Sequence, residues 1–464
     1  MVDERVLQRE ILAVGRALAA AMPAPARHPL KALDDKAMDL ASSDRELKAA
    51  LFRFIDVVPA CRSLDDLARH LTGFLGELNT PPPPVSAAMR MGNTRAGRTA
   101  LGKAAAFGVR HMAHRFIVGE DPRDALPVLR ELWKGGVASS VDLLGEATVT
   151  QREAEHYARR CSDALEAIVA ASRAWPSRPQ LERDAAGPLP RANLSVKVSA
   201  LTPLLRADAP ERGKRDAAER LRGLLRQARE LDAHLHIDME SLDSRDAVLE
   251  LVLELLAEEE FRPGPSAGMV LQAYLRDSPE TLDAVVDWAR GAGASRERPL
   301  TVRLVKGAYW DHEIVEAAQH GWTAPVFEVK ADCDRNYEAL TRRLFDARHE
   351  GTGVRVAIAS HNLRSVSHAI AYNRLSGGAD LDIELQVLRG LGDPLQVAIA
   401  AQGLHVRTYC PVGDLVAGMA YLVRRLLENT SNDSFLHEQA RGVPVDVLLE
   451  PPGGTPEAPA PAPA

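Results

Sequence analysis

The stretch of sequence that decides the fold contains the segments ANLSVKVSAL (192–201), AERLRGLLRQARELD (218–232), AHLHIDME (233–240) and AVLELVLELLAEEE (247–260). The first and third are short and largely apolar, which is typical of buried strands. The second and fourth have the leucine spacing of amphipathic helices. A strand, a helix and a second strand in this order predict a right-handed βαβ unit with parallel strands.

The same alternation continues in both directions along the chain. Six further segments complete a set of eight strand candidates: VASSVDLLGE (137–146), AGMVLQAYL (267–275), LTVRLVKGA (300–308), VRVAIASHN (354–362), LDIELQVLRG (381–390) and HVRTYCPVG (405–413). A helical stretch follows each of them, so the pattern predicts an α/β fold with a (β/α)8 TIM barrel. A doubly wound open sheet is the alternative, but no strand candidate precedes the GxGxxG fingerprint of dinucleotide-binding sheets.

The composition excludes several classes of protein. The 464 residues include 57 Lys and Arg against 64 Asp and Glu, a formal net charge of −7. This balance argues against nucleic acid as a partner, because phosphate binding needs a basic face. The four cysteines are far apart, which disfavours disulfides and structural zinc and fits a cytoplasmic protein. The N-terminal residues lack the apolar core of a signal peptide, and no apolar run reaches the roughly 18–20 residues of a membrane-spanning helix.

Composition also divides the chain into four parts. Residues 1–80 are predicted to form an N-terminal α-helical arm. Residues 81–137 are predicted to be a linker and helical lead-in, and the four prolines at 81–84 favour extended backbone there. Residues 138–440 hold the barrel. The Pro/Ala-rich residues 441–464 cannot bury a core, and we expect them to be disordered.

Most of the predicted strands end in polar or charged residues, although the strands of a parallel barrel are buried and should be apolar. These residues are Glu146, Lys197, Asp238 with Glu240, Gln272, Arg303 with Lys306, His361 with Asn362, Gln386 with Arg389, and Arg407 with Tyr409. Chemistry in a barrel takes place at the carboxyl ends of its strands, so their recurrence at one end predicts an active site. For any single residue, a solvated loop position is the alternative.

The segment TVRLVKGAYWDHE (301–313) indicates a flat ligand. Alternation along the strand places three residues on one face: Arg303, Val305 and Gly307. Lys306 is on the other face, and Tyr309 and Trp310 add flat apolar surfaces beside a fixed cation. A glycine leaves room for a flat ligand or another backbone. An arginine at the reducible edge of a flavin would stabilise the anionic reduced ring. Surface ion pairs and a core tryptophan are the alternative.

The segment MAYLVRRLLENTSNDSF (419–435) predicts a helix that faces an anion. Tyr421, Arg424, Arg425 and Glu428 occur at i, i+3, i+4 and i+7, so they line one helical face. Arginine binds carboxylates through two parallel hydrogen bonds, and a small substrate bearing a carboxylate is the simplest such anion. A surface ion pair with Glu428 is the alternative.

The residues alone leave two other enzyme classes open. A metal-dependent hydrolase would take its ligands from His234, His236, Asp238 and His361. We favour an arrangement in which the histidines at 234 and 236 lie low in the barrel or in the preceding turn and only the aspartate reaches the site. A class I aldolase would form a Schiff base on Lys197 or Lys306. A non-enzymatic interaction module would leave the polar strand ends unexplained.

Seven motifs occur in one order along the chain: NLSVKVSAL (193–201), HIDME (236–240), VLQAY (270–274), VRLVKGAYWD (302–311), ASHN (359–362), TYCPVGD (408–414) and AYLVRRLLEN (420–429). Together with SVDLLGEA (140–147), they resemble proline dehydrogenase, and in particular the proline dehydrogenase domain of the proline utilization A family. The resemblance implies a distorted (βα)8 barrel that holds FAD non-covalently, with its eighth helix over the active site.

The resemblance also implies roles for individual residues. Arg424 and Arg425 would hold the proline carboxylate, and Glu146 would pair with Arg424 to close the site. The rest of the substrate pocket would consist of Lys197, Asp238, Tyr309, Tyr409 and Tyr421. The FAD contacts would come from Gln272, Arg303, Val305, Gly307, Trp310, Lys330, His361 and Glu428. No metal site is expected.

The implied reaction is the oxidation of L-proline to pyrroline-5-carboxylate, with hydride transfer to the flavin, as the first step of proline catabolism to glutamate. A membrane quinone would reoxidise the flavin, which implies peripheral contact with the inner face of the cytoplasmic membrane. Bifunctional relatives continue into an aldehyde dehydrogenase domain, and some begin with a ribbon-helix-helix DNA-binding segment. The sequence resembles neither segment, so we expect one activity, a separate pyrroline-5-carboxylate dehydrogenase as a partner, and no repressor role.

Overall fold

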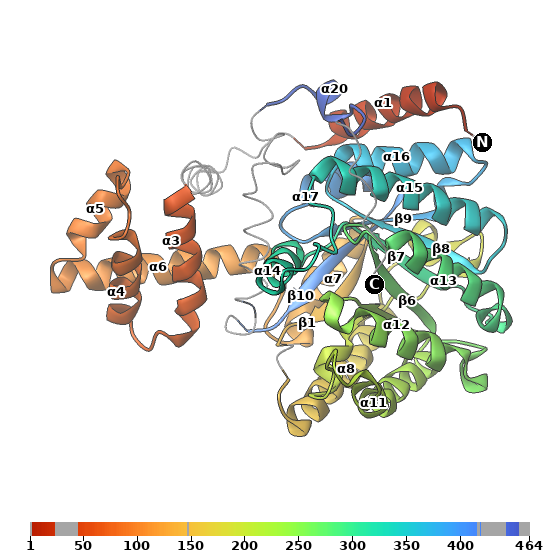
Figure 1. Cartoon of the computed structure of the whole chain (residues 1–464), viewed down its shortest axis with the longest axis horizontal. Helices are drawn as coiled ribbons and strands as arrows, with labels where there is room; N and C mark the ends of the chain where they lie inside the picture. The colour runs from red at the N-terminus through yellow and green to blue at the C-terminus, as the bar shows by residue number, and fades with distance from the viewer. Residues whose placement is uncertain (1, 24–44, 146–147, 415–417, 419–441, 454–464) are drawn as a thin grey trace.

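The computed structural model describes residues 2–23, 45–145, 148–414, 418 and 442–453. Its centre is a closed barrel of parallel strands in the order β1-β10-β9-β8-β7-β6-β5-β4 (Figure 1). The eight strands are β1 (Val137–Leu143), β4 (Asn193–Lys197), β5 (His234–Asp238), β6 (Ser266–Gln272), β7 (Leu300–Val305), β8 (Val354–Ala359), β9 (Ile383–Leu388) and β10 (His405–Val412). They coincide with the eight predicted segments, so the predicted (β/α)8 barrel is confirmed.

The barrel closes at β1, which pairs with β10 on one side and with β4 on the other. Val137 lies opposite Val406, and Val141 lies opposite Leu194. Every residue of β1 is buried, because the barrel interior covers one face of a strand and the outer helices cover the other. The apolar composition of the strand segments follows from this double burial.

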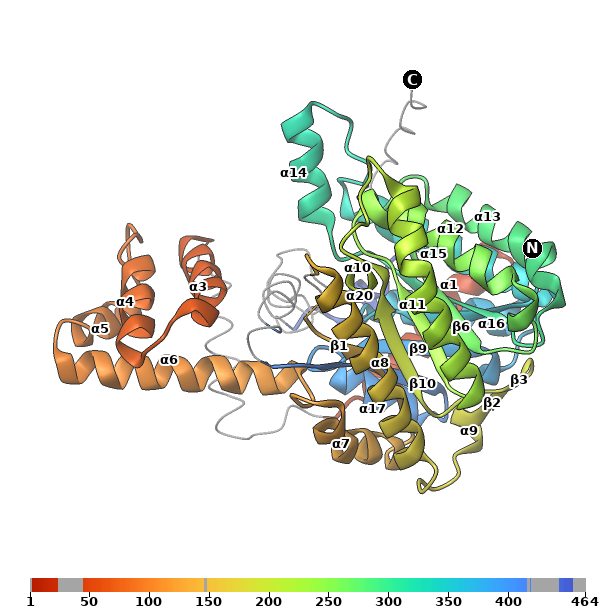
Figure 2. The same cartoon turned by 90° about the horizontal axis from the view of Figure 1, so that it is seen from below.

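Helices cover the outside of the barrel (Figure 2). They are α7 (Pro122–Lys134), α8 (Gln151–Ser172), α11 (Pro210–Glu230), α12 (Leu242–Ala257), α13 (Ser278–Arg290), α15 (Lys330–His349), α16 (Leu363–Leu375) and α17 (Asp393–Ala401). Local sequence explains their starts: α8 begins with a capping box between Thr150 and Glu153. On α11, Leu221, Leu224 and Leu225 are buried on one face, as the predicted amphipathic spacing requires.

Short elements fill the connections between these strands and helices. They are α9 (Pro179–Glu182), α10 (Val198–Leu201), the hairpin of β2 (Arg183–Asp184) and β3 (Gly187–Pro188), and the 3-10 turns Glu259–Phe261, Ala292–Ser295 and Asp380–Asp382. Helix α14 (Trp310–His320) follows β7 and stands out from the barrel in Figure 2.

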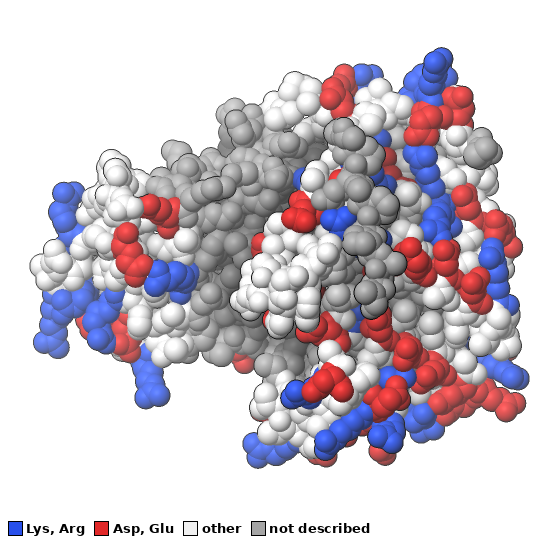
Figure 3. Space-filling model, in the orientation of Figure 1, with Lys and Arg blue, Asp and Glu red and all other residues white. Residues whose placement is uncertain are grey.

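A helical arm precedes the barrel and projects to one side of it (Figure 1). It consists of α3 (Arg45–Val57) with the 3-10 turn Val58–Ala60, α4 (Leu64–Leu75), α5 (Pro83–Met91) and α6 (Arg95–Phe116). Leu47, Ala50, Leu75, Leu78 and Val85 form its small core. Residues 81–116 contain no Asp or Glu, so this part of the arm is basic, and Figure 3 shows Lys and Arg side chains at its outer end.

The proline run at 81–84 follows the prediction of extended backbone at Pro82, with φ −55° and ψ 153°, but not in its second half. Pro83 and Pro84 form the start of α5. The first helical positions have no intrahelical acceptor for an N–H, so proline loses nothing there and its fixed φ suits the helix.

Helix α1 (Glu4–Ala21) lies on the barrel rather than in the arm. It packs against α16 and α17, and Leu7, Ile11 and Leu18 are buried in the main core. The short helix α20 (Val445–Leu448) lies beside it, and Gly15 leaves room there, because a Cβ at this position would lie 2.5 Å from Leu449. The region 1–80, predicted as one arm, is therefore divided between the barrel and the arm.

A buried charge network at the carboxyl end of the barrel

Five strands bring a polar network together inside the carboxyl end of the barrel, with Asp238 of β5 at its centre. The Asp238 carboxylate accepts hydrogen bonds from Arg303 Nη1 of β7 at 2.8 Å and from Tyr409 OH of β10 at 2.6 Å. Lys197 Nζ of β4 lies 3.4 Å from Asp238 Oδ2 and 2.5 Å from Asp142 Oδ1 of β1. Two carboxylates and two cations therefore alternate in one buried cluster.

The strand register explains why these side chains meet. Lys197 and Asp238 are the last residues of β4 and β5 and lie opposite each other. Ser195, two positions before Lys197, shares its strand face and donates to Asp238 at 3.0 Å. The carboxyl ends of parallel strands meet at one rim of a barrel, so the polar strand ends that the sequence predicted converge there.

Burial and charge together set the protonation of this network. Burial alone would raise the pKa of Asp238, but the Lys197 and Arg303 cations outweigh it and hold the pKa below its usual value. Burial raises the pKa of Tyr409 well above its usual value, and the carboxylates of Asp142 and Asp238 add to this effect. Asp238 is therefore an ionised acceptor at neutral pH, and Tyr409 is a neutral donor.

Arg303 is fixed on several sides. Its side chain is 4% exposed, and the guanidinium lies 5.3 Å from the centre of the Tyr409 ring. Nη1 also reaches Ser195 Oγ at 3.2 Å, whereas Nε has no partner among the described residues. Alternation along β7 places Lys306 on the outer side, where it pairs with Asp334. The predicted division of these two cations between opposite strand faces is confirmed.

Three of the residues predicted to contact FAD lie at the ends of β6, β7 and β8. Gln272, the last residue of β6, donates from Nε2 to Glu240 O at 2.9 Å, and its buried Oε1 has no partner among the described residues. Val305 is the last residue of β7 and is partly buried. His361 follows β8, and its Nε2 accepts from Leu388 N at 2.8 Å.

Three other predicted residues lie around α14 and the start of α15. Tyr309 directly precedes α14 and is partly buried against the cluster that contains Tyr274 and Val326. Trp310 begins α14, is 40% exposed, and donates from Nε1 to Phe327 O at 2.9 Å. Lys330 begins α15 and donates to Asp334 at 2.7 Å.

Gly307 has a role that only glycine can fill. Its φ is +141°, a conformation that L side chains rarely adopt. A Cβ at this position would lie 2.4 Å from ring atoms of Tyr274. We expected a flat ligand or another backbone to approach here, but among the described residues it is the side-chain ring of Tyr274 that occupies the space that glycine leaves.

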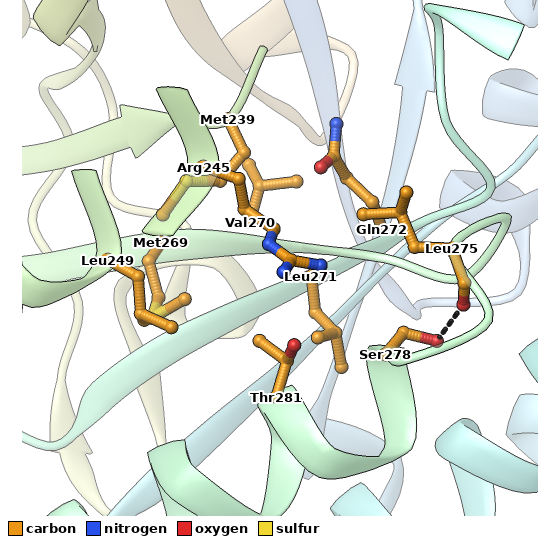
Figure 4. A pocket seen from close by; sticks show the side chains of 10 residues that line it. All are labelled: Met239, Arg245, Leu249, Met269, Val270, Leu271, Gln272, Leu275, Ser278 and Thr281. Carbon is orange, nitrogen blue, oxygen red and sulfur yellow. Dashed lines mark hydrogen bonds between the residues drawn. The ribbon is translucent and has the colours of Figure 1, made fainter. Parts of the chain in front are cut away.

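The cavity shown in Figure 4 lies beside Gln272 but outside this network. It measures about 10 Å³, room for roughly one water molecule, and apolar residues form more than half of its lining: Met239, Leu249, Met269, Val270, Leu271 and Leu275. Its charged residue, Arg245, pairs with Asp277 and Asp246. This cavity is a packing defect in the barrel wall rather than a substrate pocket.

A second charged layer lies lower in the barrel. Glu384 of β9 accepts from Arg407 Nε at 2.8 Å and Nη2 at 3.0 Å, and His405 Nε2 lies 3.3 Å away. Burial alone would raise the pKa of Glu384, but the Arg407 charge and His405 hold it far below its usual value. We predicted Arg407 at the end of its strand with Tyr409, and this is wrong: β10 begins at His405, so Arg407 lies near its start.

His234 and His236 also lie low in the barrel, as we favoured from the sequence. Their rings stack, His234 Nε2 lies 3.1 Å from His236 Nδ1, and His234 Nδ1 lies 2.8 Å from Ser266 Oγ. Burial lowers the pKa of His234 to about 3, and the Arg407 charge adds to this effect. No three His, Cys, Asp or Glu side chains in the described part of the chain are grouped to hold a metal ion.

Five predicted site residues lie outside the described residues: Glu146, Tyr421, Arg424, Arg425 and Glu428. The disorder predicted for residues 441–464 is wrong for 442–453, where α20 forms and Leu448 and Leu449 are buried in the main core; residues 441 and 454–464 lie outside the described residues.

Sequence reasoning missed Asp142. It stands inside the apolar segment VASSVDLLGE, and its side chain is 1% exposed. A charged residue within a strand that is buried on both faces is a signal in itself, because buried charge is costly without a partner. Its partner, Lys197, could not be identified without the pairing of β1 with β4.

A closed parallel barrel with a paired charge network at the carboxyl ends of its strands is the arrangement of (β/α)8 barrel enzymes. Comparison with known proteins agrees with the motifs in the sequence. A family model described as proline dehydrogenase matches residues 125–438, and one described as the proline utilization A N-terminal domain matches residues 8–116. The chain therefore belongs to the proline dehydrogenase family.

Individual relatives agree in sequence and in structure. The bifunctional protein PutA of Salmonella typhimurium is 33% identical over 366 residues, which are 77% of this chain and 26% of that protein. The proline dehydrogenase of Deinococcus radiodurans is 28% identical over 70% of this chain and 89% of its own length. The crystal structure of proline utilization A from Bdellovibrio bacteriovorus, inactivated by N-propargylglycine, has a TM-score of 0.88 at 34% identity and covers 98% of this chain.

This chain spans about a quarter of the length of the bifunctional relatives that it matches and 45% of the Bdellovibrio chain. In the described part of the chain, no helix is both long enough and apolar enough to cross a membrane.

Proposed function

We propose that this chain oxidises L-proline to pyrroline-5-carboxylate with FAD as its cofactor, in the first step of proline catabolism to glutamate. The family match over residues 125–438 supports this substrate. The observation that carries the proposal is the buried network in which Lys197, Asp238 and Arg303 meet at the carboxyl rim of the barrel. A network of this kind combines a cation for a substrate carboxylate with a fixed charge for a redox ring.

The described residues fit FAD at one point: Gln272 Oε1 is a buried acceptor without a partner among them. The residues that we propose to hold the cofactor are Gln272, Arg303, Val305, Gly307, Trp310, Lys330, His361 and Glu428. When bound, FAD would supply the hydride acceptor at its flavin.

The side chains of the network have separate tasks in this proposal. The Lys197 ammonium attracts the substrate carboxylate, and Arg303, held by Asp238 at 2.8 Å, provides a fixed positive charge beside the ring. The proline amine must lose a proton before hydride can leave the adjacent ring carbon. Nearby cations favour its neutral form, because like charges disfavour each other at close range. Most of the catalysis is then positioning and electrostatics.

The remaining roles rest on the resemblance to the family. We propose that Arg424 and Arg425 clamp the proline carboxylate, that Glu146 pairs with Arg424, and that Tyr309, Tyr409 and Tyr421 surround the substrate ring. We also propose cytoplasmic localisation, reoxidation by a quinone with peripheral membrane contact, and a separate dehydrogenase that consumes the product. Because the Bdellovibrio relative is inactivated by N-propargylglycine, we expect this compound to inactivate the present chain as well.

Absorbance and turnover test the proposal directly. The purified chain should be yellow with flavin absorbance, and L-proline should drive the reduction of a dye acceptor. Arg425→Ala should raise KM for proline steeply and leave FAD bound. Arg374→Ala is a matched control that also removes an arginine. Arg374 lies on the outer helix α16 and pairs with Asp380, which follows that helix. Colourless protein that reduces no dye with L-proline would overturn the assignment.

A further inference from the structure

Asp142 is the acidic member of the network for which the proposed reaction has not yet assigned a task. It lies in β1 with its side chain 1% exposed, and its Oδ1 is 2.5 Å from Lys197 Nζ. The distance from Lys197 Nζ to Asp238 Oδ2 is longer, 3.4 Å. The ammonium of Lys197 is therefore drawn toward β1 rather than toward β5.

This position is a costly one for a carboxylate. A buried ion pair is often no more stabilising than apolar side chains of the same volume, whereas removing one partner is strongly destabilising. Parallel barrel strands are usually filled by Val, Ile and Leu. Stability alone therefore does not explain an aspartate here, and paired charges at the carboxyl end of barrel strands indicate a functional constraint.

The contacts of Asp142 and Asp238 with the two cations indicate a role for Asp142 in holding Lys197. Lysine has a flexible four-carbon stem and binds as a point charge, so its position depends on what holds it. Lys197 also donates to Asp238 at 3.4 Å, and Asp238 accepts from Arg303 and Tyr409 as well. With Asp142 in place, the shorter contact of Lys197 is with Asp142, and the shorter contact of Asp238 with a cation is with Arg303.

We propose that Asp142 is a positioning residue that fixes Lys197 Nζ for the substrate carboxylate and reserves Asp238 for Arg303 and Tyr409. This inference rests on the proposed function, since it concerns the same site. The direction in which the affinity for a carboxylate ligand changes distinguishes a positioning role of Asp142 from a purely electrostatic one. Loss of the Asp142 charge makes the site more cationic, so a purely electrostatic role would tighten the binding of a carboxylate. A positioning role would weaken it.

Asp142→Asn keeps the shape of the side chain and removes its charge. We expect D142N to raise KM for L-proline about tenfold or more and to lower kcat less, with FAD content unchanged. Calorimetry with cyclopentanecarboxylate, which has the carboxylate but no ring nitrogen, should show a similar loss of affinity without turnover. Glu384→Gln is the matched control: it also removes a buried charge paired with a cation, but in the lower layer. E384Q should lower Tm and leave the dissociation constant within about twofold.

A double-mutant cycle with Lys197→Met tests whether Asp142 acts through Lys197. D142N should cost no further affinity in the K197M background. The double variant removes both charges of the pair, so it keeps the test available if D142N alone fails to fold. Unchanged or tighter binding by D142N, additive losses in the cycle, or equal losses in D142N and E384Q would each overturn the proposal. If the wild-type chain reduced no dye with L-proline, the proposed oxidation would be wrong, while the calorimetric comparison would still decide the role of Asp142.

Discussion

Replacing Gly307 with alanine tests the backbone geometry on which the cofactor side of the site depends. The added Cβ would lie 2.4 Å from ring atoms of Tyr274, and the φ of +141° would be strained for any L side chain. Tyr274 cannot move away easily, because it is 2% exposed within its own apolar cluster.

The magnitude follows from these two effects. Backbone strain in a sparsely populated region costs about 1–3 kcal/mol, and overpacking a filled site costs about 1–3 kcal/mol more. The sum is about 2–6 kcal/mol. An unfolding entropy of about 2.1 cal/mol/K per residue gives roughly 1 kcal/mol/K for 464 residues, so Tm should fall by about 2–6 °C.

Gly321→Ala is the matched control. Gly321 ends α14 with a φ of +68°, and nothing lies within 4 Å of an added Cβ. Left-handed backbone alone costs about 1–2 kcal/mol, so Tm should fall by only about 1–2 °C.

Calorimetric scans and the flavin absorbance per mole of protein measure both variants. G307A should lose more stability than G321A and should also bind less FAD, because residue 307 is proposed to face the cofactor. Equal Tm values for the two variants would refute the close contact with Tyr274. Full FAD content in a destabilised G307A would refute the proposed place of the cofactor.

Three further predictions concern other buried polar groups. Gln272→Leu removes the unpartnered acceptor Oε1 and should weaken FAD affinity about tenfold, measured by titration of the apoprotein; unchanged affinity would place FAD elsewhere. Glu384→Gln breaks the pair with Arg407 and should lower the free energy of unfolding in urea by about 3–5 kcal/mol, and a loss below about 1 kcal/mol would contradict the buried pair. Burial lowers the pKa of His234 to about 3 and the pKa of His405 to about 4. In the unfolded chain, a histidine has its usual pKa of about 6.5. Below that pH the unfolded chain binds more protons, so stability should fall as pH drops from about 6.5 toward 4, and His405→Gln should reduce the slope in urea unfolding.

The fold could be predicted because its signals are local. Each strand is a short apolar segment, and each outer helix has a leucine spacing that needs no knowledge of its neighbours. The error at Arg407 has a different origin. Its predicted segment has nearly the observed bounds, but β10 continues to Val412 and pairs with β1 from Val406 onward, so Arg407 is the third residue of the strand and not near its end.

The site could be predicted where the barrel rule applies. Lys197, Asp238 and Arg303 stand at or near strand ends, and strand ends converge in a barrel whatever the details of register. The ion pair of Asp142 with Lys197 depends on which residues lie opposite each other in two strands separated by a long helix. The unpartnered Oε1 of Gln272 likewise depends on three-dimensional packing. Neither has a counterpart in spacing or composition.

We expect the lower charged layer of the barrel to serve stability and the upper charged layer to serve ligand binding. In the lower layer, the Glu384 carboxylate holds Arg407 through two hydrogen bonds from one guanidinium, an arrangement that fixes β9 against β10. In the upper layer, Asp238 divides its oxygens among side chains of three other strands, and Arg303 Nε has no partner among the described residues. The pair of Glu384 with Arg407 is bidentate, whereas the upper network retains a buried N–H, Arg303 Nε, that no described residue accepts. Substitutions in the lower layer should therefore change Tm at constant KM, and substitutions in the upper layer should change ligand binding before they change stability.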